Sequence, residues 1–284
     1  MPGFRGVVPI ALFLAGSSPG AAQPPRHQII VDAVYASRLL WRGVPRVSNP
    51  VTQAAATAVL EVPAGHLSLG IWSAIEFHGP EESEFSIAGS DQRLAEIDYT
   101  LQYAARRGEV DLVGGISHYD LRNDVAIGTL GPSFSTTELY AAVSVREGLL
   151  RSLGFTPSVR AWFDVDKVGG GYAEFELTYE MPVVPIEKPL VGIHLSVRSG
   201  LSLGQSTADG ATGYFDEDGF THVETSALLT GRITPWLGVG FNWRLSFGLD
   251  PATQRGDPRS VATDRSSWGW IETWVTLRLP GRTW

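Results

Sequence analysis

Polar and apolar residues alternate along most of the chain beyond residue 26, a pattern typical of β-strands whose two faces meet different surroundings. The clearest example is AEIDYTLQY at 95–103, where Ile97, Tyr99 and Leu101 share one parity and polar side chains occupy the other. Similar segments of about 9 to 14 residues follow one another, so we predict about twelve strands. No linker or repeat divides them, and residues 23–284 are predicted to form one domain.

The connections between these segments differ in length in a regular way. After every second segment the connection is short, as at 63–65 and 233–235, whereas the intervening connections are long, as at 78–92 and 203–219. Short turns at one end and long loops at the other are typical of outer-membrane β-barrels. A soluble sandwich has no physical reason to sort its connections in this way.

The number of apolar positions favours a membrane barrel over a soluble one. About twelve strands would close around a wide interior, and one layer of apolar side chains could not fill that interior without voids. With the faces reversed, lipid covers the apolar side and water and paired charges fill the lumen, while closure leaves no unpaired strand edge in hydrocarbon. We therefore predict an all-β protein, a single antiparallel transmembrane β-barrel.

In this barrel the polar parity faces the lumen. The first strand is expected to run on through VYASRLLWRGV at 34–44, with Leu39 and Trp41 pointing outward. The charged residues predicted to face the lumen are Asp32, Arg38, Arg42, Glu96, Asp98, Glu138, Arg160, Asp164, Glu174, Glu176, Arg198, Glu224, Arg244 and Glu272. The aromatic residues predicted to lie at the two membrane interfaces are Trp41, Phe77, Tyr103, Phe163, Tyr179 and Phe247.

The N-terminus has the order of a secretory signal, with Arg5 before the apolar run VVPIALFLAG and small residues before Gln23. We predict cleavage after Ala22, which makes residues 1–22 a signal peptide, because the apolar run is too short to span a membrane as a helix. Export and the barrel pattern together predict the cell outer membrane. The expected partners are outer-membrane lipid and lipopolysaccharide, small solutes, and periplasmic chaperones with the barrel-assembly machinery during biogenesis.

Charge and cysteine content narrow the classes further. The formal charge of −8 makes a nucleic-acid-binding surface improbable. The chain has no cysteine, so neither a disulfide nor an acylated cysteine is expected.

Several short motifs occur in the order of a known family. They are Ser37, Trp41, Arg42 and Gly43, then Gly70, Trp72 and Ser73, then Glu96, Ile97, Asp98 and Tyr99, and further on Glu138, Tyr140, Asp164, Gly171 and Tyr172. In this respect the chain resembles the TorF-type porins of Gram-negative envelopes. The resemblance implies an outer-membrane channel and does not supply a substrate.

We expect passive diffusion of small solutes or ions. Carboxylates outnumber arginines about two to one on the predicted inward faces, which favours cations weakly if the lumen is open. The alternative is that these groups pair and merely fill the barrel. Another alternative is a non-conducting structural or adhesin barrel, in which the long loops carry the function.

A barrel-borne hydrolase is the least favoured alternative. Ser117 and His118 are neighbours in a strand, so their side chains point to opposite faces and a nucleophile cannot reach its base. Asp164 and Asp166, with glycines at 169–171, suggest calcium ligands, but a solvated loop tip explains them better. We predict no catalytic residue, no metal site and no cofactor.

Overall fold

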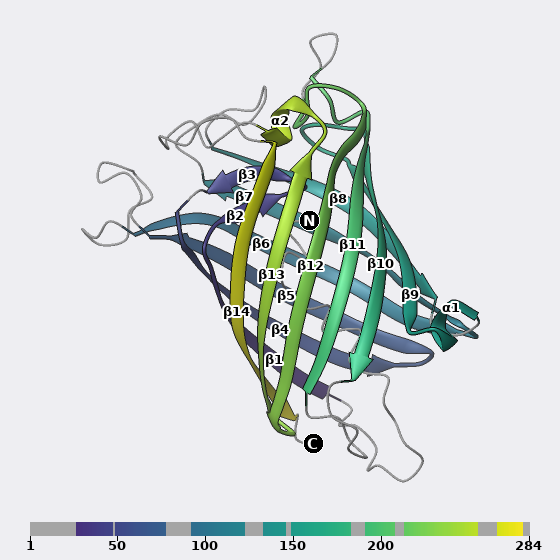
Figure 1. Cartoon of the computed structure of the whole chain (residues 1–284). Coiled ribbons are helices and arrows are strands. Elements are labelled where there is room, and N and C mark those ends of the chain that lie inside the picture. The colour runs from purple at the N-terminus through teal and green to yellow at the C-terminus, as the bar shows by residue number, and fades with distance from the viewer. Residues whose placement is uncertain are drawn as a thin grey trace.

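The computed structural model describes residues 27–47, 49–77, 92–122, 133–145, 149–182, 191–207, 213–254 and 266–280. The predicted signal peptide, residues 1–22, lies outside the described residues. Within them, 12 strands form a closed antiparallel barrel, which confirms the predicted fold class (Figure 1). The wall strands are β1 (His27–Ala36), β4 (Val51–Val62), β5 (Gly65–Glu76), β6 (Arg93–Arg107), β7 (Val110–Arg122), β8 (Ser133–Val145), β9 (Phe155–Asp164), β10 (Gly171–Pro182), β11 (Val191–Leu203), β12 (Gly219–Thr234), β13 (Leu237–Gly248) and β14 (Ser267–Pro280).

The first and last wall strands close the sheet. β1 pairs with β14, for example at Asp32 with Thr276, and on its other side with β4, at Asp32 with Ala55. Every other wall strand pairs with its sequence neighbours. A closed ladder leaves no wall strand with an unpaired edge, which is what hydrocarbon surroundings require.

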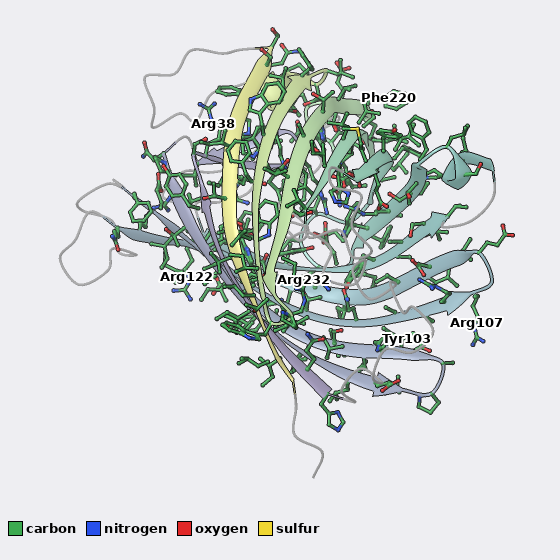
Figure 2. All side chains as sticks on the ribbon, turned by 60° about the horizontal axis from the view of Figure 1, so that its bottom comes forward. Arg38, Tyr103, Arg107, Arg122, Phe220 and Arg232 are labelled. Atoms are coloured by element: carbon green, nitrogen blue, oxygen red, sulfur yellow. The ribbon has the colours of Figure 1, made fainter. Side chains whose placement is uncertain are left out.

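Turn lengths differ between the two ends, as the sequence predicts. β4 and β5 are joined by Pro63 and Ala64, and β6 and β7 by Gly108 and Glu109. β1 begins and β14 ends at this short-turn end, where Gln28 pairs with Pro280. Figure 2 shows Tyr103 and Arg107 of β6 at this end, far from Arg38 at the long-loop end.

The outward positions of the wall strands carry exposed apolar side chains, and the inward positions carry buried polar ones. In β6, Leu101 is 44% exposed whereas Asp98 is 4% exposed. Comparable outward residues are Ile29, Leu69, Ile71, Leu139, Val159, Phe175, Leu195, Val197, Leu229, Phe241, Ile271 and Val275. This apolar exterior matches the lipid-facing band of outer-membrane barrels, and it locates the protein in that membrane.

The described residues also include two one-turn helices, α1 (Leu149–Ser152) and α2 (Pro251–Gln254). Neither of them is long and apolar enough to cross a membrane.

The expected course of the first strand is wrong. β1 ends at Ala36, where the Ser37 N–H donates to the Ile271 carbonyl at 3.0 Å, and the chain then turns into a separate two-stranded hairpin. This hairpin consists of β2 (Leu39–Trp41) and β3 (Val44–Val47), drawn in Figure 1 behind β14 and β13 at the end that carries α2. We call residues 38–47 the inner hairpin.

The turn of the inner hairpin explains why the strand does not continue. Its central residues, Arg42 and Gly43, have φ values of 51° and 80°, so both are left-handed. Two such residues form the type I′ turn that suits the twist of a tight hairpin. Trp41 is consequently 3% exposed inside the barrel and is not the interface aromatic that the sequence predicts.

The other predicted interface aromatics lie near strand ends. Phe163 and Phe247 are 54% and 43% exposed near the long-loop ends of β9 and β13, and Phe77 is half-buried just beyond β5. At the short-turn end, the Tyr103 hydroxyl donates to the Ala64 carbonyl at 3.1 Å. There too the Tyr179 ring packs 5.1 Å from the ring of Phe155.

Candidate functional site in the barrel lumen

Three arginines of the inner hairpin contact three different parts of the wall. The Arg38 guanidinium lies 5.4 Å from the centre of the Trp268 ring on β14. Arg42 pairs with Glu138 on β8 at 2.6 Å, and Arg46 lies 3.9 Å from Glu96 on β6. The hairpin is therefore held from several sides and crosses the lumen. Arg38 and Arg42 lie inside the barrel as predicted, but on this hairpin and not on a wall strand.

The most enclosed contact is that of Arg42. Its Nη1 donates to Gln205 Oε1 at 2.7 Å and its Nη2 to Glu138 Oε2 at 2.6 Å. Aromatic rings cover the guanidinium, with ring centres 4.3 Å away in Trp41, 5.3 Å in Trp162 and 4.4 Å in Tyr172. Burial lowers the pKa of Arg42 and the Glu138 carboxylate raises it, and the net pKa lies above the ordinary value. The guanidinium is therefore charged at neutral pH.

Apolar packing on three sides holds the same hairpin. Leu40 packs with Trp268 and Trp270 of β14. Leu39 and Val47 pack with a group of wall residues and their neighbours, namely Ala36, Val51, Ala74 and Ala95. Trp41 and Val44 join an aromatic cluster made of Tyr140, Trp162, Tyr172, Tyr214 and Phe215. These aromatics occupy inward positions, so the lumen at this level is apolar as well as charged.

The tip of the inner hairpin fits against β12 only because residue 43 is glycine. A Cβ at Gly43 would lie 2.6 Å from Cγ of His222. Such a distance is shorter than real Cβ contacts, and the positive φ disfavours other residues in any case. The tip is therefore docked closely on the wall.

Charged side chains on β9 to β14 form a continuous series that we call the Arg–Glu ladder. Its members are Arg160, Glu174, Glu176, Arg198, Glu224, Arg244 and Glu272, all of which the sequence predicts to face the lumen. The closest contacts join Arg160 to Glu176 at 2.7 Å, Arg198 to Glu176 at 3.3 Å, Arg244 to Glu224 at 3.1 Å and Arg244 to Glu272 at 3.2 Å. Acid and base alternate along the ladder, so its charges largely compensate one another.

A pocket lies between the ladder and the inner hairpin. On the hairpin side it is lined by Arg38, Leu39, Leu40, Arg42 and Gly43. On the wall side every ladder residue except Glu176 lines it, together with Trp162, His222 and Trp270. A solute passing the hairpin on this side would meet both signs of charge and two indole rings.

The opposite part of the wall carries a second charged group. Arg93 Nε donates to Glu76 Oε2 at 3.0 Å, and both side chains are fully buried on β6 and β5. Glu96 and Asp98 of β6 are buried nearby on the inner face. Sequence reasoning missed Arg93, because it follows the long 78–92 segment directly and has no preceding strand residues to set its parity.

Toward the short-turn end, hydroxyl groups also occupy inward positions of the wall. Thr100 and Ser117 lie within 3.2 Å of each other on β6 and β7, and Ser196 and Ser226 within 2.8 Å on β11 and β12. Short polar side chains leave space inside a barrel of this size.

The residues considered for hydrolysis and for metal binding have other roles. Ser117 is 1% exposed on the inner face, whereas His118 Nδ1 lies 3.0 Å from Thr137 Oγ1 on the outer face. Asp164 organises the turn from β9 to β10, where its Oδ1 accepts the N–H of Asp166 at 2.9 Å and of Val168 at 3.2 Å. Across the described ranges, no three His, Asp or Glu side chains are grouped to hold a metal ion.

Comparisons with known proteins bear on the fold. No protein-family model matches the sequence, and no curated protein matches it. The structure is similar to that of the NanC porin, with a TM-score of 0.50 and 8% identity over 88% of this chain and 100% of that chain. It is also similar to LpxR from Salmonella typhimurium, with a TM-score of 0.50 and 11% identity over 87% of this chain and 99% of that chain.

The fold therefore defines the class: this chain is an outer-membrane β-barrel with the architecture of the porins. A more distant neighbour is outer membrane phospholipase A from Escherichia coli, with a TM-score of 0.41 and 12% identity over 89% of this chain and 97% of that chain. Whether this barrel is a channel or an enzyme has to be argued from its lumen.

Proposed function

We propose that this protein is a narrow outer-membrane channel for the passive diffusion of small polar solutes or ions, with the inner hairpin as its constriction. The observation that carries the proposal is the pocket between the inner hairpin and the Arg–Glu ladder, which is lined mainly by charged side chains. A barrel that served only as a scaffold would have no need for a polar pocket beside its hairpin. Beyond the hairpin, hydroxyl groups line the wall and favour water.

Selectivity among ions is expected to be weak at the constriction, and the cation preference expected from the whole lumen is not expected to persist there. The pocket is lined by Arg38, Arg42, Arg160, Arg198 and Arg244 against Glu174, Glu224 and Glu272, so acid is not in excess. Arg46 and Arg93 add positive charge that the count from sequence left out. Compensated charges select poorly by sign and more by size.

The same proposal includes export of the chain and its assembly in the membrane. The resemblance to TorF-type porins supports a channel, and residues 1–22 would be removed as a signal peptide on export. Periplasmic chaperones and the barrel-assembly machinery would then deliver the chain to the membrane, where lipopolysaccharide and lipid contact the exposed apolar face.

A non-conducting barrel is the second candidate, and one observation favours it. The inner hairpin packs with Tyr214 and Phe215, which follow β11, so two connections of the long-loop end meet inside the lumen. Trp41 and Tyr214 are in edge contact at 4.3 Å between ring centres. If this cluster seals the barrel, the protein passes nothing.

Conductance in planar lipid bilayers tests the proposal. We expect the wild-type protein to give small steps, and a variant in which a short Gly-Ser linker replaces residues 38–47 to give steps several-fold larger. Replacing exposed Asp166 and Lys167 with serine is the matched control and should leave the steps unchanged. If neither the wild type nor the linker variant conducts, the channel is refuted and the structural barrel is favoured. Equal steps from both would show that the inner hairpin is not the constriction.

A further inference from the structure

The groups that surround Arg42 come mostly from outside the inner hairpin. Glu138 belongs to β8, Trp162 to β9 and Tyr172 to β10, while Gln205 follows β11. The two oxygens accept hydrogen bonds from the guanidinium nitrogens, and the ring centres lie 5.3 Å or less from its central carbon. Edge acceptors combined with aromatic faces are the means by which proteins recognise planar organic cations.

These groups are held in place by contacts that do not involve Arg42. Gln205 Nε2 donates to Glu138 Oε1 at 3.4 Å. The Trp162 and Tyr172 ring centres lie 5.7 Å apart, and Tyr172 also stacks on Phe215 at 5.7 Å. These contacts fix part of the arrangement without Arg42, and such preorganisation is what a binding site requires.

Burial makes an empty site costly. Glu138 is 0% exposed, and a buried carboxylate without a cation is strongly disfavoured. Removing the Arg42 side chain should therefore leave the buried Glu138 carboxylate without a cation, in a site that fits a cation of the same shape. Na⁺ fits such a site poorly, because it has no N–H groups to donate to the Glu138 and Gln205 oxygens.

We propose that the barrel wall contains a binding site for guanidinium groups, formed by Glu138, Trp162, Tyr172 and Gln205, and that Arg42 fills it as a ligand supplied by the chain itself. Soluble compounds that carry a guanidinium group are the class of ligand that can replace it. Because Arg42 is tethered, its effective concentration at the site is high, and a free ligand competes poorly in the wild-type protein. The site itself does not depend on the proposed function.

Chemical complementation of R42G tests the site. Glycine suits the left-handed conformation at position 42, so the hairpin turn is retained while the guanidinium is lost. We expect guanidinium chloride at millimolar concentrations, far below those that unfold proteins, to change the tryptophan fluorescence of R42G saturably in detergent micelles. The same concentrations of NaCl should not do so, and neither should guanidinium added to the wild type.

R106A is the matched control. Arg106 pairs with Asp111 at 2.9 Å on the exposed rim, so its removal leaves a solvated carboxylate in place of an enclosed site. No saturable response to guanidinium is expected from R106A. The double variant R42G/E138Q should bind guanidinium at least about tenfold more weakly than R42G, because the charged acceptor is lost.

A linear response or none in folded R42G would overturn the site, as would equal binding by R42G and R42G/E138Q. If R42G does not fold, the variant with a linker in place of residues 38–47 presents the same wall groups and must show the saturable response. Binding by R42G without conductance in any variant would refute the channel and leave the site standing. Conductance without binding would refute the site alone.

Discussion

Arg93 and Glu76 show how single residues hold this barrel together. Their side chains are 0% and 1% exposed, and Arg93 also donates to the Arg122 carbonyl at 2.6 Å. Two charges taken out of water are tolerated only when each compensates the other. Removing one of them leaves a buried charge whose partner is gone, and such a loss is far larger than that of a pair in solvent.

R93A is therefore expected to lower the free energy of unfolding by about 3 to 5 kcal/mol, because Glu76 is left uncompensated. R106A removes an arginine that is 52% exposed and should cost less than about 1 kcal/mol. Urea unfolding of both variants in lipid vesicles measures the difference. Equal losses would mean that water reaches Glu76 in the membrane-inserted barrel.

The inner hairpin is the element on which the constriction depends. Its turn needs two left-handed residues, its tip needs a residue without a Cβ, and its arginines need partners on separate wall strands. Gly43 meets the requirement at the tip, whereas the partners of the arginines lie far away in the chain. The hairpin is thus stable as part of the barrel, since an isolated two-stranded hairpin of this length is marginal in water.

Gly43 and Gly108 offer a matched test of that docking. G43A combines a positive φ with a Cβ placed 2.6 Å from His222, so we expect the tip to leave the wall and the conductance to rise. Gly108 has φ +57°, and a Cβ added there would meet nothing within 4 Å. G108A should then cost about 1 to 2 kcal/mol from backbone strain and leave the conductance unchanged. A rise in conductance with both variants, or with neither, would contradict close docking of the tip.

The two surfaces of the barrel wall suit two different surroundings, lipid outside and water inside. Its exterior carries residues such as Leu101 and Phe175 at 44% and 45% exposure, which would be unfavourable in water and is favourable in lipid. Its interior carries the Arg–Glu ladder and hydroxyl groups. Because the wall is closed, each strand serves both surroundings at once through its alternating side chains.

L101R tests this orientation at the scale of the whole barrel. An arginine at this outward position near the middle of β6 should lower the free energy of unfolding in lipid by about 2 to 4 kcal/mol. L153R is the control, because Leu153 is 58% exposed in the turn after α1, beyond the wall strands, and its replacement should cost at most about 1 kcal/mol. Unfolding titrations in vesicles compare the two. An equal effect would place Leu101 outside the hydrocarbon.

Much of this architecture was predictable because alternation is a local property. In each wall strand, the alternation of polar and apolar residues identifies the two faces within a few positions. The sorting of short and long connections indicates closure in a membrane. The ladder residues from Arg160 to Glu272 were all assigned to the lumen on parity alone. Their pairing follows from the register of adjacent strands, for example Arg198 opposite Glu224.

The path of residues 37–47 was decided only by tertiary structure. The strands of a hairpin alternate just as wall strands do, so parity could not reveal that Leu39 and Trp41 pack inside the barrel and not against lipid. The local signals were the Arg42–Gly43 turn and Pro45, a residue that central strands avoid. The partners of Arg42 are 96 and 163 residues away in the chain, at Glu138 and Gln205. Contacts over such separations form only when the closed wall brings the strands together, and they lie beyond what periodicity can express.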